Sequence, residues 1–198
     1  MGNQENIRFK TYRSAPNLLT LLRICLMPFL VAAVLEGRYR LGFLLFVVAG
    51  FSDALDGALA RMLRQRTVLG EYLDPVADKL LLSTLFLVLT HKGLIPTTVT
   101  VLVFGRDLGI LLVAAILYAA VSRREFTPSV YGKANTVTQV TAIALVLLHQ
   151  FLAAEWVVIL RLVALYATAA LTVFSGLHYA WTTARMLGTH SGSGTAPK

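Results

Sequence analysis

The stretch that decides the fold, SDALDGALARMLRQRTVLGEYLDPVADKL at residues 52–80, sets four aspartates between long apolar runs. Hydrophobic residues make up 57% of the 198 residues and charged residues only 14%, whereas about a quarter of a soluble domain is charged. An aspartate at the centre of a membrane helix costs about 2.5 to 3.5 kcal/mol. Four of them in one short stretch therefore need partners or a function.

The apolar runs on both sides of this stretch predict six membrane helices, since each crossing of the bilayer takes about 20 residues. We expect an all-α, polytopic membrane protein with both termini in the cytoplasm. The expected helices are 17–35, 41–63, 72–91, 94–121, 135–153 and 155–184. We expect residues 1–15 to form a cytoplasmic N-terminal segment, residues 16–187 one six-helix membrane domain, and residues 188–198 a disordered tail.

The basic residues predict the orientation of these helices. With both termini in the cytoplasm, most lysines and arginines fall in inner segments, and the outer loops hold only Arg38, Arg40 and Lys92. The same distribution explains the net charge of +8 without nucleic acid. The charges lie in short loops that face anionic lipid, and no nucleic-acid-binding motif accompanies them.

The first acidic face lies on the helix expected at 41–63. Asp53 and Asp56 are three residues apart, so they share one side of a helix. Gly57 and Ala60 continue that side with residues too small to fill the space beside it. The face is therefore acidic at one end and open along its length.

The second acidic face lies on the next helix, where Gly70, Asp74 and Asp78 recur at steps of four residues. A short loop joins the two helices, so we expect them to be antiparallel neighbours whose acidic faces meet. Four converging carboxylates offer hard oxygen ligands, which Mg²⁺ and Mn²⁺ prefer. The sequence predicts a site with two such ions, an arrangement that recurs in displacement at phosphorus. An alternative is structural, with the aspartates paired to Arg61, Arg64 and Lys79.

The same residues resemble a known family. They match D-x2-D-G-x2-A-R-x8-G-x3-D-x3-D, the signature of the CDP-alcohol phosphotransferase family of integral membrane enzymes. The segments PNLLTLLRI at 16–24 and LDPVADKLLL at 73–82 are similar to its phosphatidylglycerophosphate synthase and cardiolipin synthase branches. The matching positions are Asp53, Asp56, Gly57, Ala60, Arg61, Gly70, Asp74 and Asp78.

The resemblance implies that residues 16–187 form a six-helix CDP-alcohol phosphotransferase domain. In such an enzyme the diphosphate of CDP-diacylglycerol meets divalent metal, an alcohol attacks the lipid-side phosphorus, and CMP leaves. It implies metal ligation by Asp53, Asp56, Asp74 and Asp78, with Asp78 also the candidate general base. It further implies CDP-lipid contacts from a second set of residues: Asn17, Gly57, Ala60, Arg61 and Gly70.

Two basic residues are candidates for binding the acceptor. Arg106 lies in the apolar run FGRDLGILL, and Lys133 opens the helix expected at 135–153. Guanidinium and ammonium groups bind phosphate, and the resemblance places acceptor contacts at these positions. The best expectation for the acceptor is glycerol 3-phosphate, which gives phosphatidylglycerophosphate. The alternative is phosphatidylglycerol, as in a cardiolipin synthase, because the adjacent residues Arg106 and Asp107, together with Asn135, resemble that branch. Arg106 could also serve only to pair with an aspartate, and Lys133 only to cap a helix at the interface.

Two other classes of membrane protein also place carboxylates in the bilayer. A cation-coupled transporter distributes them across the membrane, whereas here they gather at one end of two adjacent helices. A prenyl-transferring enzyme uses paired aspartates with Mg²⁺, but the A-R-x8-G spacing has no role in it. We therefore expect an enzyme of the bacterial cytoplasmic membrane, with its active site facing the cytoplasm. The resemblance implies that the protein can form a homodimer, although the sequence itself does not decide the oligomeric state.

Overall fold

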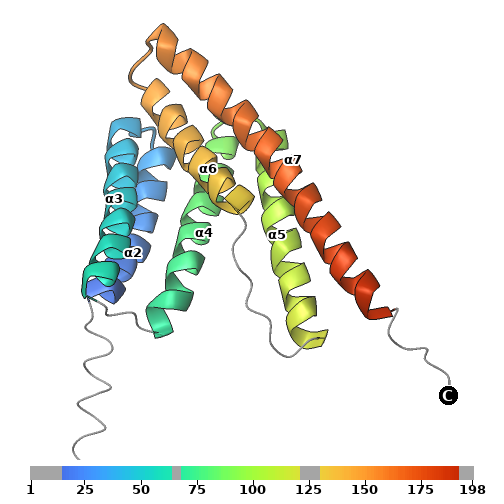
Figure 1. Cartoon of the computed structure of the whole chain (residues 1–198). Coiled ribbons are helices and arrows are strands. Elements are labelled where there is room, and N and C mark those ends of the chain that lie inside the picture. Colours follow the sequence, from blue (N-terminus) through green and yellow to red (C-terminus); the bar gives the residue numbers. More distant parts are fainter. Residues whose placement is uncertain (1–14, 64–67, 121–129, 192–198) are drawn as a thin grey trace, which may run out of the picture. The chain divides into compact units, whose positions relative to one another are not determined.

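The computed structural model of the chain describes residues 15–63, 68–120 and 130–191. Within these ranges the chain forms six α-helices and no strand, which confirms the predicted all-α fold (Figure 1). Side chains are described for fewer residues, and those of residues 53–76 lie outside the description. The helices are α2 (Ala15–Leu35), α3 (Tyr39–Leu63), α4 (Val68–His91), α5 (Thr97–Ala120), α6 (Val130–His149) and α7 (Glu155–Ser191).

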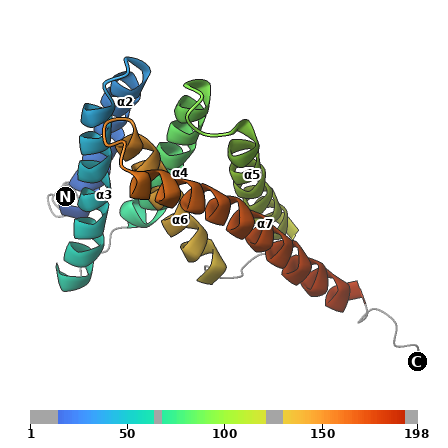
Figure 2. The ribbon, with the colours of Figure 1, turned by 90° about the horizontal axis from the view of Figure 1, so that it is seen from above.

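The helix bounds differ from the predicted ones mainly near the C-terminus. Helix α6 begins at Val130 rather than at 135, and it ends at His149 rather than at 153. Its last turn tightens, because the amides of Gln150 and Phe151 donate to carbonyls three residues back, at 3.2 Å each. Helix α7 continues to Ser191, beyond the predicted end at 184, and Figure 2 displays it as one continuous helix.

Two glycines end helices in the left-handed conformation that L side chains rarely adopt. Gly37 follows α2 with φ 75°, and Gly93 follows α4 with φ 69°. At the first, the amide of Arg38 donates to the Ala33 carbonyl at 2.8 Å, which is the hydrogen bond of a Schellman cap. At the second, the Leu94 amide donates to the Leu89 carbonyl at the same distance of 2.8 Å. These caps fix two of the turns that separate the predicted spans.

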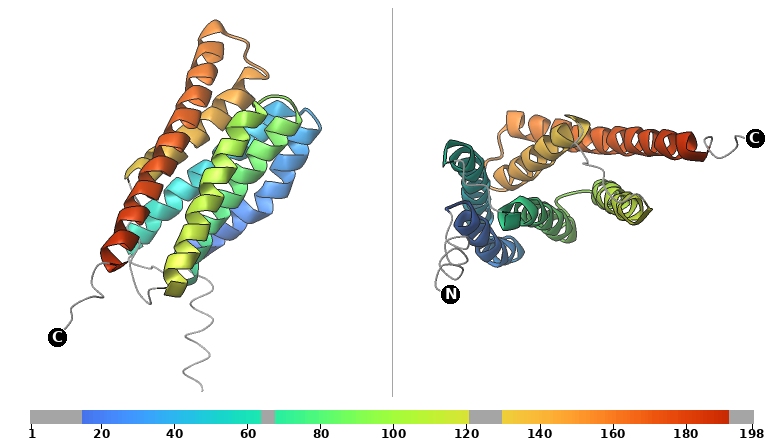
Figure 3. Two further views of the ribbon diagram at one scale, coloured as in Figure 1. Left: turned by 90° about the vertical axis from the view of Figure 1, so that its right-hand side faces the viewer. Right: turned by 60° about the horizontal axis from the view of Figure 1, so that its bottom comes forward.

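The chain divides into two compact units. Unit 1 holds residues 1–95 and 143–158, and therefore α2, α3 and α4. Helix α2 packs against both α3 and α4, as Figure 3 illustrates. Gly42 permits a close approach to α2, since a Cβ there would lie 3.0 Å from Val34 Cγ2. The largest apolar side chains buried in this unit include Leu30, Phe46, Leu85, Phe86 and Leu89.

Unit 2 holds residues 96–142 and 159–198, and therefore α5, most of α6 and most of α7. A hydrogen bond of 3.0 Å joins α6 to α7, donated by Thr172 Oγ1 to Asn135 Oδ1. Both side chains are buried, as are Gln139, Thr168 and Ser175. This unit therefore carries a polar seam within otherwise apolar helices.

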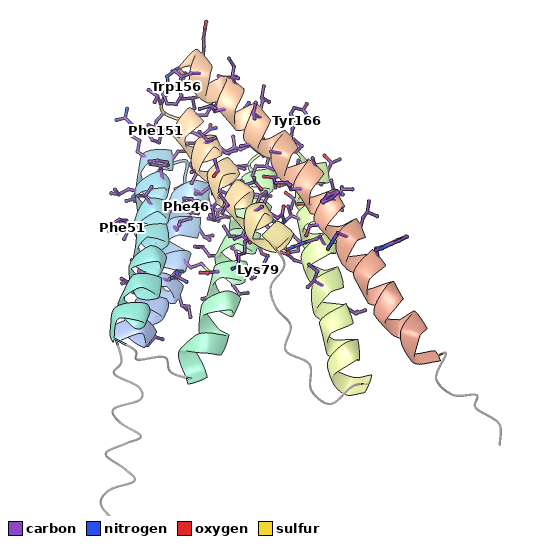
Figure 4. All side chains as sticks on the ribbon, in the orientation of Figure 1. Phe46, Phe51, Lys79, Phe151, Trp156 and Tyr166 are labelled. Carbon is purple, nitrogen blue, oxygen red and sulfur yellow. The ribbon has the colours of Figure 1, made fainter. Side chains whose placement is uncertain are left out.

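One segment of the described residues, Glu155–His178 in α7, is long and apolar enough to cross a membrane. Large apolar side chains on α7 lie exposed, among them Trp156 at 54% and Tyr166 at 74% (Figure 4). Shorter apolar segments occupy Leu21–Leu35 and Tyr39–Ser52. The other five expected spans stay predictions.

Candidate functional site

The four aspartates of the motif lie on two consecutive helices of unit 1. Asp53 and Asp56 are on α3, and Asp74 and Asp78 are on α4. Because both segments are helical, the spacing of three and of four residues keeps each pair on one helix face. The roles of the first three stay predictions, because their side chains lie outside those that the structure describes. The same holds for Asn17, Gly57, Ala60, Arg61 and Gly70.

Asp78 is the aspartate of the motif whose side chain the structure describes. It forms an ion pair with Arg23, whose Nη1 donates to Asp78 Oδ1 across 55 residues of sequence. The Arg23 side chain is 2% exposed, whereas that of Asp78 is 38% exposed. The Arg23 guanidinium is therefore buried, and the Asp78 carboxylate is partly exposed.

Our sequence reasoning assigned no role to Arg23. The signal was present, since a single arginine interrupts the apolar run LLTLLRICLM at 18–27. A charge inside such a run needs a compensating partner. The helix that supplies the partner could not be deduced from the run itself.

An apolar cavity of about 250 Å³ lies beside this ion pair, between α2 and α4. Met27 and Val31 line it from α2, and Leu80 and Leu81 line it from α4. Pro28 also lies along it, at a position where the ring removes one backbone donor from the helix. Arg23 is the charged residue among the side chains that line this space.

Arg106 is held by two partners within unit 2. Its Nη1 donates to Asp107 Oδ1 at 2.7 Å, and its Nη2 donates to Ser175 Oγ on α7 at 3.0 Å. The side chains of Arg106 and Asp107 are 8% and 14% exposed. The pairing with Asp107 that the sequence left open is therefore present, and Ser175 is a partner that the sequence did not indicate.

Lys133 lies at the start of α6, in the first turns of the helix, and is exposed. It is two residues from Asn135, which is buried and bonded to Thr172. Its role as an acceptor contact stays a prediction. Asp78 belongs to unit 1, and Arg106 and Lys133 belong to unit 2.

Among the described side chains, no group of three or more His, Cys, Asp and Glu residues could hold a metal ion. The predicted ligands Asp53, Asp56 and Asp74 lie outside that set. The chemistry of the donors nevertheless fits Mg²⁺ or Mn²⁺, because all four predicted ligands are carboxylates on two helices of one unit. Asp78, the described member, has a partly exposed carboxylate that is paired with Arg23.

Comparison with known proteins places the chain among lipid-synthesising enzymes. It is 41% identical over 104 residues to the human cardiolipin synthase (CMP-forming), a match that covers 52% of the chain and 34% of that enzyme. The chain thus spans about a third of the length of this relative.

Bacterial relatives match over most of their length. A probable phosphatidylglycerophosphate synthase of Mycobacterium tuberculosis is 34% identical over 170 residues, covering 82% of the chain and 78% of that protein. The CDP-diacylglycerol–glycerol-3-phosphate 3-phosphatidyltransferase of Haemophilus influenzae is 31% identical over 169 residues, covering 83% and 90%. The family model described as CDP-alcohol phosphatidyltransferase matches residues 13–181, which include every predicted site residue. The chain belongs to the CDP-alcohol phosphatidyltransferase family.

Proposed function

We propose that this protein transfers the phosphatidyl group of CDP-diacylglycerol to glycerol 3-phosphate, producing phosphatidylglycerophosphate and CMP. The observation that carries this proposal is the family match over residues 13–181. The Haemophilus influenzae relative, named for this reaction, supports it because the match covers 90% of that protein.

In the proposed reaction, a hydroxyl oxygen of the acceptor forms a bond to the lipid-side phosphorus. The bond from that phosphorus to the bridging oxygen breaks, and CMP leaves with the bridging oxygen. The hydroxyl proton passes to the carboxylate of Asp78. The Asp78 side chain is 38% exposed, so an acceptor hydroxyl can reach it. Gly57, Ala60, Arg61 and Gly70 contact the nucleotide, and Asn17 contacts the diphosphate.

Enzymes of this family generally use divalent metal ions. We assign Asp53, Asp56, Asp74 and Asp78 as the ligands of two Mg²⁺ or Mn²⁺ ions. When bound, such ions neutralise the diphosphate and stabilise the departing charge. The protein's contribution is to keep several carboxylates close together on two helices, which is unfavourable unless cations are bound.

Arg106 and Lys133 select an acceptor that carries a phosphate. Hydrogen bonds to Asp107 and Ser175 hold the guanidinium of Arg106 in one orientation. The side chain therefore loses less conformational freedom when it binds the acceptor phosphate. The second candidate activity is that of a cardiolipin synthase with phosphatidylglycerol as acceptor. The 41% identity to the human cardiolipin synthase favours it, as does the resemblance of the adjacent residues Arg106 and Asp107 to that branch.

The family consists of membrane-associated enzymes of lipid synthesis. For this chain we propose six spans, both termini in the cytoplasm, and an active site that faces the cytoplasm from a bacterial inner membrane. The excess of basic residues in the expected inner segments supports this orientation. A homodimer is the proposed assembly.

The decisive experiment mixes purified protein with CDP-diacylglycerol, Mg²⁺ or Mn²⁺, and either glycerol 3-phosphate or phosphatidylglycerol. CMP release and the mass of the lipid product are then measured. We expect phosphatidylglycerophosphate with the first acceptor, and loss of the reaction on chelation or in Asp56→Asn. Cardiolipin from the second acceptor alone would replace the first assignment by the second. CMP released equally well when both acceptors are left out would overturn both assignments. No release of CMP under any condition would do the same.

A further inference from the structure

Arg23 is the most deeply buried charged side chain that the structure describes in unit 1, at 2% exposure. It lies on α2, a helix that carries none of the motif aspartates. Its guanidinium nevertheless reaches α4 and binds Asp78 Oδ1. An ion pair thus joins α2 to the acidic face of α4.

The surroundings of this ion pair make it costly to disturb. Met27, Val31 and Leu81 line the cavity together with Arg23, so this part of the α2–α4 interface is apolar. Arg23 is 2% exposed, so loss of the Asp78 carboxylate would remove a partner from a buried charge, which costs more than loss of a partner at the surface. The ion pair therefore favours one position of the Asp78 carboxylate.

The two ends of the pair differ in a way that suits a site. Arg23 is enclosed, whereas the Asp78 side chain keeps 38% exposure. Arg23 Nη1 binds one carboxylate oxygen, Asp78 Oδ1, in a charge-assisted hydrogen bond, which restrains the carboxylate from the interior. The Asp78 side chain is thus restrained through one oxygen and remains partly exposed.

We propose that Arg23 is a positioning residue for phosphatidyl transfer, which holds the Asp78 carboxylate in its working orientation. The inference rests on the proposed function for the identity of the reaction. It does not rest on that function for the coupling between the two residues, which can be measured without substrate. A small displacement of a reacting group can cost about 100-fold in rate.

The first test compares the wild-type enzyme with Arg23→Gln and Arg23→Lys in kcat and KM. We expect Arg23→Gln to lower kcat by about 100-fold per folded molecule, with the KM for CDP-diacylglycerol within about threefold. Arg23→Lys keeps the charge, because an ammonium still binds a carboxylate without the planar fork. Its kcat should recover to about a tenth of the wild-type value or more. The matched control is Arg161→Gln, which removes another arginine from an apolar helix and should leave kcat unchanged.

Two kinetic outcomes would overturn the proposal. One is an Arg23→Gln enzyme whose kcat per folded molecule equals that of the wild type, so that only the yield of folded protein falls. The other is an Arg23→Lys enzyme no more active than Arg23→Gln. Size-exclusion chromatography supplies the folded fraction for each variant.

The second test is a thermal double-mutant cycle of Arg23→Gln, Asp78→Asn and the double variant. If the pair is coupled, the double variant should lose less thermal stability than the two single losses added together. Additive losses would overturn the proposal. Because the melts need no substrate, a coupled pair in a protein without transferase activity would refute the proposed function while keeping the ion pair.

Discussion

At the residue scale, Asp78 carries the sharpest test of the proposed chemistry. Asp78→Asn keeps the shape of the side chain and removes the charge that a proton acceptor and a metal ligand both need. We expect turnover to fall by about 100-fold or more, because general-base catalysis typically contributes at least that factor. Binding of CDP-diacylglycerol should persist, as measured with labelled lipid on folded protein. Activity above about a tenth of wild type would contradict the base role.

Ser175 offers a test of how the acceptor is chosen. Its Oγ accepts a hydrogen bond of 3.0 Å from Arg106, and the side chain is buried at 4% exposure. Ser175→Ala should loosen the guanidinium and raise the KM for the acceptor several-fold, with the KM for CDP-diacylglycerol unchanged. Thr141→Ala is the matched control, since that exposed hydroxyl donates to the Val137 carbonyl of its own helix. Equal changes in both KM values would remove Arg106 from acceptor selection.

The sequence predicted residue types for the site, but it did not predict their partners. The motif predicts the aspartates because their residue type and their helical spacing can both be read from one short segment of sequence. Arg23 and Ser175 act across 55 and 69 residues of sequence, to Asp78 and Arg106. Such pairs depend on how each helix is rotated about its axis, and an almost uniformly apolar helix carries little signal for that rotation.

At the scale of elements, the polar seam between α6 and α7 gives two neighbouring amides different surroundings. Asn135 Oδ1 accepts from Thr172, whereas neither polar atom of the Gln139 side chain has a hydrogen-bond partner among the described residues. Both amides are fully buried, at 0% exposure. A buried polar group without a hydrogen-bond partner lowers the stability of the fold. Removal of a bonded polar group leaves the other member of the hydrogen bond buried and unsatisfied.

We therefore expect opposite effects from two matched substitutions in α6. Asn135→Leu should lower the free energy of unfolding by about 1 to 3 kcal/mol, because the buried Thr172 hydroxyl loses its acceptor. Gln139→Leu should leave stability unchanged or raise it, because an apolar side chain replaces an amide that has no hydrogen-bond partner in the described part of the chain. Thermal unfolding in one detergent measures both. Equal losses would mean that Gln139 has a partner of its own.

The helices themselves were predictable because their signals are local. Apolar runs mark the interior of each helix, and Gly37 and Gly93 mark two ends. The start of α6 was missed because the residues from Val130 to Ala134 include polar and small side chains that resemble a loop. In this chain hydropathy identifies the apolar part of a helix more reliably than its ends.

At the scale of the whole molecule, each compact unit is assembled from two separate stretches of chain. Residues 143–158 join unit 1, and residues 159–198 join unit 2, so the division falls inside the continuous helix α7. The sequence predicted one membrane domain, since nothing in the composition of α7 changes at that point. Membership of a unit is set by long-range packing, which hydropathy does not encode.

The orientation of the chain in the membrane is the last prediction. Because basic residues gather in the expected inner segments, both termini should face the cytoplasm and the turn after α2 should face outwards. In a Cys25→Ser background, Glu36→Cys in that turn should react with a membrane-impermeant maleimide on intact cells, since Glu36 is exposed. Thr195→Cys, near the C-terminus, should react only after the cells are permeabilised. Labelling of both positions on intact cells would refute the even number of spans, because an even number puts the two termini on the same side as each other and opposite to that turn.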